Sequence, residues 1–124
     1  MTTPPDSLAH LNARLLQFAR DRDWEQFHSP KNLAMALAGE AGELLEQFQW
    51  LTEAQSAQLT DKQRQAVAHE LADILIYLIR LGERLDIDLI AAANEKMAIN
   101  AQRYPIERVK GDARRAGEYD ATSD

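Results

Sequence analysis

The sequence predicts an all-α protein, and three observations carry this prediction. Apolar residues return every three or four positions in four separate segments of the chain. No stretch alternates apolar and polar residues with β-branched side chains, so a sheet is not expected. Serine, threonine and aspartate stand where the helices would begin. The 124 residues fit one domain, and four helices of this kind predict a four-helix bundle.

The first predicted helix begins at Asp6 or Ser7 and is amphipathic. Residues 20–29, RDRDWEQFHS, break its period and are expected to form a loop rich in aromatic side chains. Ser29 is then a suitable N-cap, and Pro30 a suitable first residue, for the second helix. The apolar stripe of the first helix is Leu8, Leu11, Leu15 and Phe18, and that of the second is Leu33, Leu37, Ala41, Leu44 and Phe48.

The third helix has the most regular pattern in the chain. Thr60 and Gln63 form a capping box at its start, after a polar connection over residues 52–59. A stripe this long suits burial against a second chain as well as within one chain, so a homo-oligomer is expected. A fourth helix follows Asp86 or Asp88 and ends before Pro105. The stripe of the third helix is Val67, Leu71, Ile74, Leu78, Leu81 and Leu85.

Composition and charge exclude several classes of protein. The absence of cysteine removes disulfides, thiolate metal sites and cysteine nucleophiles. No apolar run approaches the roughly 18 residues of a membrane span, and the first residues lack a signal peptide, so no membrane partner and a cytoplasmic location are expected. The formal net charge of -6 argues against a nucleic-acid partner. The helical domain is predicted over residues 1–105, and the patternless residues 106–124 are expected to be a disordered tail.

Carboxylates at the border of the buried stripes are the main functional signal. On the second helix, Glu40 lies within about 60° of the stripe residues and Glu43 lies at the edge of the stripe. On the third helix, Glu70 lies about 60° from the stripe centre and Asp73 about 120°. If the two helices are antiparallel neighbours, the four carboxylates converge, and their repulsion then requires a cation. Oxygen ligands alone favour Mg²⁺, with Mn²⁺ as a substitute, over Zn²⁺.

These acidic residues have two other interpretations. Either pair alone is more often the solvated edge of an amphipathic helix, and the protein would then be a non-catalytic helical interaction module. Two pairs on adjacent, well-patterned helices favour the metal site over that interpretation. A di-iron bundle is disfavoured, because it needs Glu-x-x-His motifs on its metal helices and the one such spacing, from Glu25 to His28, lies in the predicted loop.

The blocks that contain these residues resemble a known family. They are similar to the MazG-like, all-α nucleoside triphosphate pyrophosphohydrolases, and to the dCTP pyrophosphatase branch among them, over about residues 8–105. The resemblance implies a homo-oligomer, a tetramer, with active sites built from more than one chain. The blocks are DWEQFH (23–28), PKNLAMALAGEAGELLEQFQW (30–50), ELADILIYL (70–78) and KMAINAQRYP (96–105).

The resemblance also implies an activity and its metal ligands. The expected reaction is hydrolysis of a nucleoside triphosphate between the α and β phosphates, with dCTP or a modified dCTP favoured and with a role in nucleotide-pool sanitation. Another triphosphate, such as dUTP or a damaged purine nucleotide, is the alternative, because a few hydrogen bonds decide base preference. Leu15 stands where some relatives place a histidine near the nucleotide. The residues that match the family's Mg²⁺ ligands are Glu40, Glu43, Glu70 and Asp73.

Roles can be assigned to further residues of the expected site. Bound metal would bridge carboxylates and phosphates and orient a water, and Glu43 is the preferred catalytic base, with Glu40 beside it. Lys96, Asn100 and Arg103 follow at i, i+4 and i+7 on the fourth helix, which suits the outer phosphates. The candidates for stacking on the base or recognising its edge are Trp24, His28, Trp50 and Tyr77, whereas Phe18, Phe27 and Phe48 are expected in the core.

Overall fold

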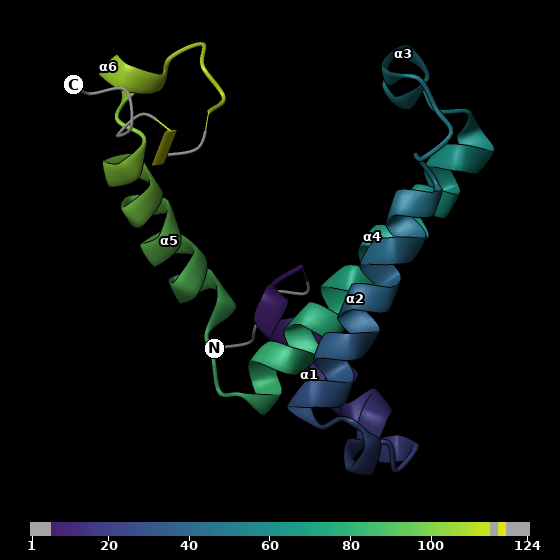
Figure 1. Cartoon of the computed structure of the whole chain (residues 1–124). Helices are drawn as coiled ribbons and strands as arrows, with labels where there is room; N and C mark the ends of the chain where they lie inside the picture. Colours follow the sequence, from purple (N-terminus) through teal and green to yellow (C-terminus); the bar gives the residue numbers. More distant parts are fainter. Residues whose placement is uncertain (1–5, 115–116, 119–124) are drawn as a thin grey trace. The chain divides into compact units, whose positions relative to one another are not determined.

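A computed structural model describes residues 6–114 and 117–118, which contain helices and no strand (Figure 1). The all-α class is therefore confirmed. Within these described residues, no helix has the length and apolar character that crossing a membrane would require. The long helices are α1 (Leu8–Asp21), α2 (Pro30–Glu46), α4 (Asp61–Arg84) and α5 (Leu89–Arg103), and the short ones are the 3₁₀ turn η1 (Glu25–Phe27), α3 (Glu53–Ser56) and α6 (Ile106–Val109).

Side-chain caps begin the long helices where the sequence predicts them. Ser7, Ser29 and Asp88 each accept a hydrogen bond from the backbone N–H three residues later, at 3.0 to 3.1 Å. Thr60 and Gln63 form the predicted capping box at the start of α4. Each cap gives a partner to an N–H group that the first turn of a helix leaves unpaired. The starts of these helices are therefore set by local sequence.

In the described part of the chain, three short helices lie where the sequence predicts none, and one of them, η1, falls in the predicted loop of residues 20–29. Residues 52–59, the predicted polar connection, contain α3, whose capping box joins Thr52 and Gln55. This is the same motif that begins α4, so the sequence contained the signal for this turn. Helix α6 lies inside residues 106–124. Residues 115–116 and 119–124 of that segment lie outside the described residues, and the disordered tail stays a prediction.

The chain divides into two compact units, one ending at Ile87 and the other beginning at Asp88. In the first unit, α2 and α4 run side by side in opposite directions, and α1 packs against α4 (Figure 1). The second unit contains α5 and α6. The antiparallel pairing of α2 and α4, on which the carboxylate prediction depends, is therefore observed.

Few apolar side chains are buried within the single chain. Leu71 and Leu85, from the predicted stripe of α4, are 52% and 48% exposed, whereas Val67 at the start of the stripe is buried. Helices α1 and α2 therefore cover only part of that stripe and leave an apolar surface beside it. The buried apolar residues in the described part of the chain are Ala19, Leu33, Val67 and Ile79.

Candidate active site

Three of the four predicted metal ligands lie together between α2 and α4. One carboxylate oxygen each from Glu40, Glu43 and Glu70 lies within 4.8 Å of the others. Glu40 and Glu43 are one turn apart on α2, and Glu70 meets them from the antiparallel α4. Ligand oxygens at about 2.1 Å from a Mg²⁺ ion stand up to roughly 4.2 Å apart across it. The 4.8 Å limit is slightly above that separation, so a small movement of the side chains would let this group hold one small cation.

The carboxylate group contains buried oxygens that have no donor. Oε2 of Glu40 and Oε2 of Glu70 are buried, and neither has a hydrogen-bond partner within the described part of the chain. Ionised carboxylates only accept hydrogen bonds, so these neighbours cannot satisfy one another. Buried polar atoms without a partner are uncommon and require an explanation. A cation bound by these oxygens would be the missing partner, and an all-oxygen ligand set fits a hard ion such as Mg²⁺.

Crowding shifts the protonation of this group. Burial, a proton that Glu40 can share with the neighbouring carboxyl groups of Glu43 and Glu70, and the negative charges of Glu43 and Asp73 raise the pKa of Glu40 to about 7. Burial also raises the pKa of Glu70, although a hydrogen bond with Glu40 acts against that shift. A protonated Glu40 can donate to a neighbouring carboxylate, which an ionised one cannot. Without a cation the group therefore retains a proton up to about neutral pH.

Asp73 lies one turn beyond Glu70 on α4 but is not part of the three-carboxylate group. It is half-buried and lines a cavity between α1 and α4. Its charge nevertheless contributes to the raised pKa of Glu40 and of Glu70. Asp73 thus connects the carboxylate group with the cavity, and its role as a fourth metal ligand stays a prediction.

The cavity has a volume of about 210 Å³ and a mostly apolar, aromatic wall. Asp73, Tyr77 and Arg80 reach it from one face of α4, because they are four and three residues apart. The rest of the wall is Leu15, Phe18 and Ala19 from α1, Ile76 from α4, and Trp24 and His28 from the segment between α1 and α2.

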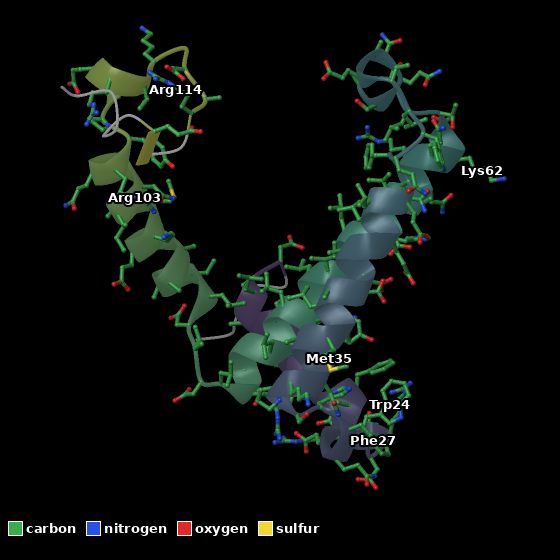
Figure 2. The ribbon with its side chains drawn as sticks, viewed as in Figure 1. Trp24, Phe27, Met35, Lys62, Arg103 and Arg114 are labelled. Carbon is green, nitrogen blue, oxygen red and sulfur yellow. The ribbon has the colours of Figure 1, made fainter. Side chains whose placement is uncertain are left out.

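A Schellman motif at the end of α1 brings Trp24 to this cavity. Asp23 has a positive φ of 53°, and its N–H donates to the carbonyl of Arg20 at 3.1 Å. The N–H of Trp24 donates to the carbonyl of Ala19 at 2.9 Å. Such a motif folds the residue after the turn back onto the last turn of the helix. The rings of Trp24 and Phe18 accordingly meet edge to face at 5.8 Å, and Figure 2 shows Trp24 at this turn.

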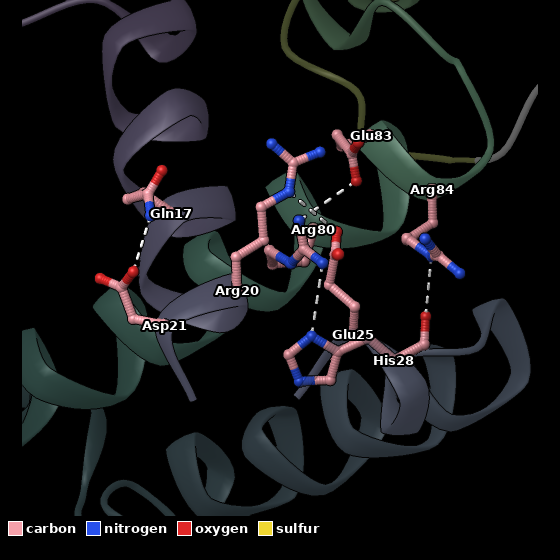
Figure 3. A network of polar contacts seen from close by, with 8 residues as sticks. All are labelled: Gln17, Arg20, Asp21, Glu25, His28, Arg80, Glu83 and Arg84. Carbon is pink, nitrogen blue, oxygen red and sulfur yellow. Dashed lines mark hydrogen bonds and ion pairs between the residues drawn. The ribbon is translucent and has the colours of Figure 1, made fainter. Parts of the chain in front are cut away.

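A polar network joins two of the cavity residues, His28 and Arg80 (Figure 3). Nη1 of Arg80 donates to Glu83 at 3.1 Å, and Nη2 lies 3.4 Å from Nδ1 of His28. Nε of Arg84 donates to the carbonyl oxygen of His28 at 3.0 Å. Burial and the charges of Arg80 and Arg84 lower the pKa of His28, against the opposing charge of Glu25. His28 is therefore neutral at neutral pH.

The structure brings three of the four predicted base-contacting residues to one place. Trp24, His28 and Tyr77 all line the cavity. Trp50 does not, because it follows the far end of α2 and is 87% exposed. Since α2 has 17 residues and is therefore about 25 Å long, Trp24 and Trp50 of one chain cannot share a base.

The predicted phosphate-binding residues belong to the second unit. Lys96, Asn100 and Arg103 lie on α5, and all three are exposed. Arg103 lies over the ring of Tyr104, with 5.9 Å between the guanidinium carbon and the ring centroid. Their contact with phosphates stays a prediction.

Phe18, Phe27 and Arg80 differ from the sequence-based expectation. The prediction that Phe18 and Phe27 lie in the core is wrong within this chain, since both are exposed and Phe18 lines the cavity. Phe18 lies in the last turn of α1, and Phe27 is the last residue of η1. The sequence alone assigns no role to Arg80, although its spacing from Asp73 and Tyr77 places it on the same helix face. A charged residue within the apolar run ILIYLIRL was the available signal.

Comparison with known proteins decides the family. A profile of the MazG-like family matches residues 36–118. The chain belongs to the MazG-like family. It is 44% identical over 113 residues to dCTP pyrophosphatase 1 of Rattus norvegicus, a match that covers 90% of this chain and 66% of the rat protein. The human protein of that name is 42% identical over 115 residues, which cover 91% of this chain and 68% of the human one. The chain thus spans about two thirds of the length of these relatives.

A solved structure also has this MazG-like fold. A pyrophosphatase from Archaeoglobus fulgidus DSM 4304 aligns with a TM-score of 0.77 at 34% sequence identity. The alignment covers 85% of this chain and 98% of the archaeal chain. The resemblance seen in the sequence is therefore confirmed by the family profile, by the curated relatives and by the fold.

Proposed function

We propose that this protein is a nucleoside triphosphate pyrophosphohydrolase that acts on dCTP or a modified dCTP. The observation that carries the proposal is the three-carboxylate group of Glu40, Glu43 and Glu70, connected through Asp73 to an aromatic cavity. The names of the relatives, dCTP pyrophosphatase 1 and a pyrophosphatase, support this reaction class.

The cavity suits the base of the nucleotide rather than the whole molecule. Its volume of about 210 Å³ is below the roughly 300–1,000 Å³ of pockets that enclose a complete ligand. Aromatic walls such as Trp24 and Tyr77 stack on flat rings. Asp73 and Arg80 are seven residues apart on α4, or about 10 Å along the helix axis. The base would occupy the Arg80 end, and the phosphates would extend past Asp73 toward the carboxylates.

Mg²⁺, or Mn²⁺ in its place, would be held by Glu40, Glu43 and Glu70, with Asp73 as the fourth ligand. When bound, the ion offsets charge that builds up on the phosphoryl oxygens. An acidic protein of formal net charge -6 needs such a cation to accept a triphosphate.

Glu43 is the proposed general base, with Glu40 as the second candidate. Glu43 is exposed and can reach a water molecule, whereas Glu40 and Glu70 are half-buried. The water oxygen forms a bond to the α phosphorus, its proton passes to the carboxylate, and the bond to the bridging oxygen breaks. The nucleoside monophosphate and pyrophosphate result. Lys96, Asn100 and Arg103 on α5 are proposed to bind the outer phosphates, since they offer donors that the carboxylate group lacks.

We further propose a homo-oligomer, a tetramer. Leu45, Trp50 and Leu71 are more than half exposed on the single chain, which is typical of a surface that another copy covers. Trp50 could then contact a base only in the cavity of another copy. Light scattering should report a mass several times the 14.0 kDa of one chain. A fully active monomer would contradict this assembly.

A turnover panel tests the activity. Purified protein with Mg²⁺ should convert dCTP and 5-methyl-dCTP to monophosphate and pyrophosphate, with a higher kcat/KM than for dUTP or an oxidised purine nucleotide. A preference for a non-canonical cytosine nucleotide would support the role in nucleotide-pool sanitation. If dUTP or the purine is preferred, the reaction class stands and the base assignment is wrong. If calorimetry with Mg²⁺ and a non-hydrolysable analogue of each finds no binding, the helical interaction module is favoured instead.

A further inference from the structure

Arg80 is a buried charge without a full set of partners. It is 2% exposed, and among the described residues its Nε has no hydrogen-bond partner. One ion pair, to Glu83 at 3.1 Å, offsets its charge. Burying a guanidinium is unfavourable unless its hydrogen bonds are made, and an aliphatic side chain would pack in its place without this cost. The guanidinium therefore requires a reason beyond packing.

The guanidinium group constrains the proton of His28. Arginine only donates hydrogen bonds, so Nδ1 of His28, 3.4 Å from Nη2 of Arg80, has to present its lone pair. A neutral imidazole with a bare Nδ1 carries its proton on Nε2. The bond from Arg84 to the carbonyl oxygen of His28 restrains the backbone of the same residue. No described residue hydrogen-bonds to Nε2, although His28 lines the cavity.

We propose that Arg80 is a positioning residue that keeps His28 neutral with its proton on Nε2, so that His28 offers one fixed N–H donor to the base. The inference rests on the proposed function, in which the base occupies the cavity. A fixed donor suits an acceptor on the base, such as the O2 or N3 atom of cytosine. A base that turned an N–H group toward Nε2 of His28 would place two donors against each other. Arg80 and His28 together therefore contribute to base specificity.

The other groups that face His28 are consistent with this assignment. Arg84 adds a second positive charge from α4, and Glu25 of η1 shares its negative charge with Arg20 of α1 at 3.6 Å. The ring of Trp24 stands edge to face with the imidazole at 6.5 Å. Among the described residues, none of these groups accepts a hydrogen bond from Nδ1, so the one polar contact of Nδ1 is with the donor Arg80.

The tautomer is measured first, on the wild-type protein without nucleotide. ¹⁵N NMR of the labelled imidazole at neutral pH should show an unprotonated Nδ1 and a proton on Nε2 of His28. A protonated Nδ1 would overturn the inference. Because this measurement needs neither nucleotide nor turnover, it is independent of the proposed function.

The consequence for the base is measured with His28 variants. His28→Gln places an amide N–H near the position of Nε2, whereas the shorter His28→Asn does not. His28→Asn should therefore raise KM for dCTP about 2- to 10-fold more than His28→Gln, which is the value of one neutral hydrogen bond, with little difference in kcat. Equal KM values for the two variants would overturn the contact. A wild-type protein that binds no nucleotide would overturn the contact and the proposed function together.

The role of Arg80 is isolated by a double-mutant cycle. Arg80→Met should raise KM about 2- to 10-fold with His28 present, and by less in the His28→Gln background, because glutamine has no tautomer to set. An equal effect in both backgrounds would show that Arg80 acts directly on the base or only on packing, and would overturn the inference. Arg80→Gln, whose side-chain amide can accept as well as donate a hydrogen bond and so no longer fixes the proton of His28, provides the same cycle if the methionine variant does not fold.

Discussion

The carboxylate group and the aromatic cavity adjoin along α4 but are built in different ways. The carboxylates come from two helices at one-turn spacing, so helical periodicity and antiparallel pairing are enough to bring them together. The cavity needs α1, α4 and the Schellman turn between α1 and η1. Its polar contact joins His28 and Arg80, which are 52 positions apart. A period along one helix predicts the first kind of site, whereas the second depends on how separate segments pack.

Without a ligand, each of the two regions also has an energetic cost, and the physical cause differs between them. The carboxylate group holds repelling charges, which is why the pKa of Glu40 is raised to about 7. The cavity leaves Phe18 and Trp24 partly exposed to water. A bound cation would relieve the repulsion among the carboxylates, and a flat base would cover the exposed aromatic rings of the cavity. Because Asp73 lies beside the carboxylate group and lines the cavity, the two regions together support the proposed metal-dependent nucleotide site.

The largest effect is expected in the carboxylate group. Glu40→Gln or Asp73→Asn should lower kcat/KM at least about 100-fold, beyond the 10- to 100-fold typical of residues that only support metal ligands. The melting temperature of the metal-free variants should stay level or rise, because repulsion is relieved. Glu46→Gln, an exposed change on the same helix, is the control. Full turnover in both variants would remove these residues from the site.

A smaller effect is expected in the cavity. Trp24→Ala should raise KM about 5- to 150-fold, because one stacking partner contributes about 1–3 kcal/mol. Nucleotide should also quench the tryptophan fluorescence of the wild-type protein. Phe27→Ala, in the neighbouring turn but outside the cavity, is the control.

Trp50→Ala distinguishes contact from packing. If Trp50 reaches the base in another copy, this variant should also raise KM. If Trp50 only packs, its partner has to be another copy, because Trp50 is 87% exposed on one chain. Truncation would then cost about 3–5 kcal/mol of stability in the assembly and leave KM unchanged. If both tryptophan variants melt early and bind nucleotide normally, the base does not occupy the cavity.

The two regions should also differ in how stability depends on pH. Since the pKa of Glu40 rises from 4.5 to about 7 on folding, the folded metal-free protein binds more protons than the unfolded chain between these values. Its stability should therefore fall as pH rises through that window. Glu40→Gln should flatten this dependence, whereas Trp24→Ala should leave it unchanged. Thermal unfolding in EDTA at several pH values measures this pH dependence of stability. Added Mg²⁺ should raise the melting temperature more at about pH 8 than at about pH 5, because the ion competes with protons for the carboxylates.

The smallest effect is expected outside both regions. Truncation after Gly111 retains α6 and removes residues such as Arg114, which pairs with Asp112 two positions away. Melting temperature and turnover should stay close to those of the full chain. A large loss of turnover at unchanged stability would show that these residues order over the site.

The sequence by itself determined the long helices, their starting caps and the carboxylates that face one another. Caps such as Ser29 act within three residues, and the pairing of Glu40 with Glu43 follows from the helical period. Both are local properties that any packing of the helices would preserve. The capping box at Thr52 is equally local, so the start of α3 could also have been predicted from the sequence.

Only the tertiary structure decided which side chains form the cavity. Phe18 is exposed at the cavity and does not lie in the core, whereas Arg80 is buried against His28. Trp50 is separated from Trp24 by the length of α2. Each outcome depends on the distance and angle between segments that are far apart in the chain. Helix periodicity specifies which face a residue occupies but not which neighbour covers that face, and that neighbour determines whether a residue is core, cavity wall or surface.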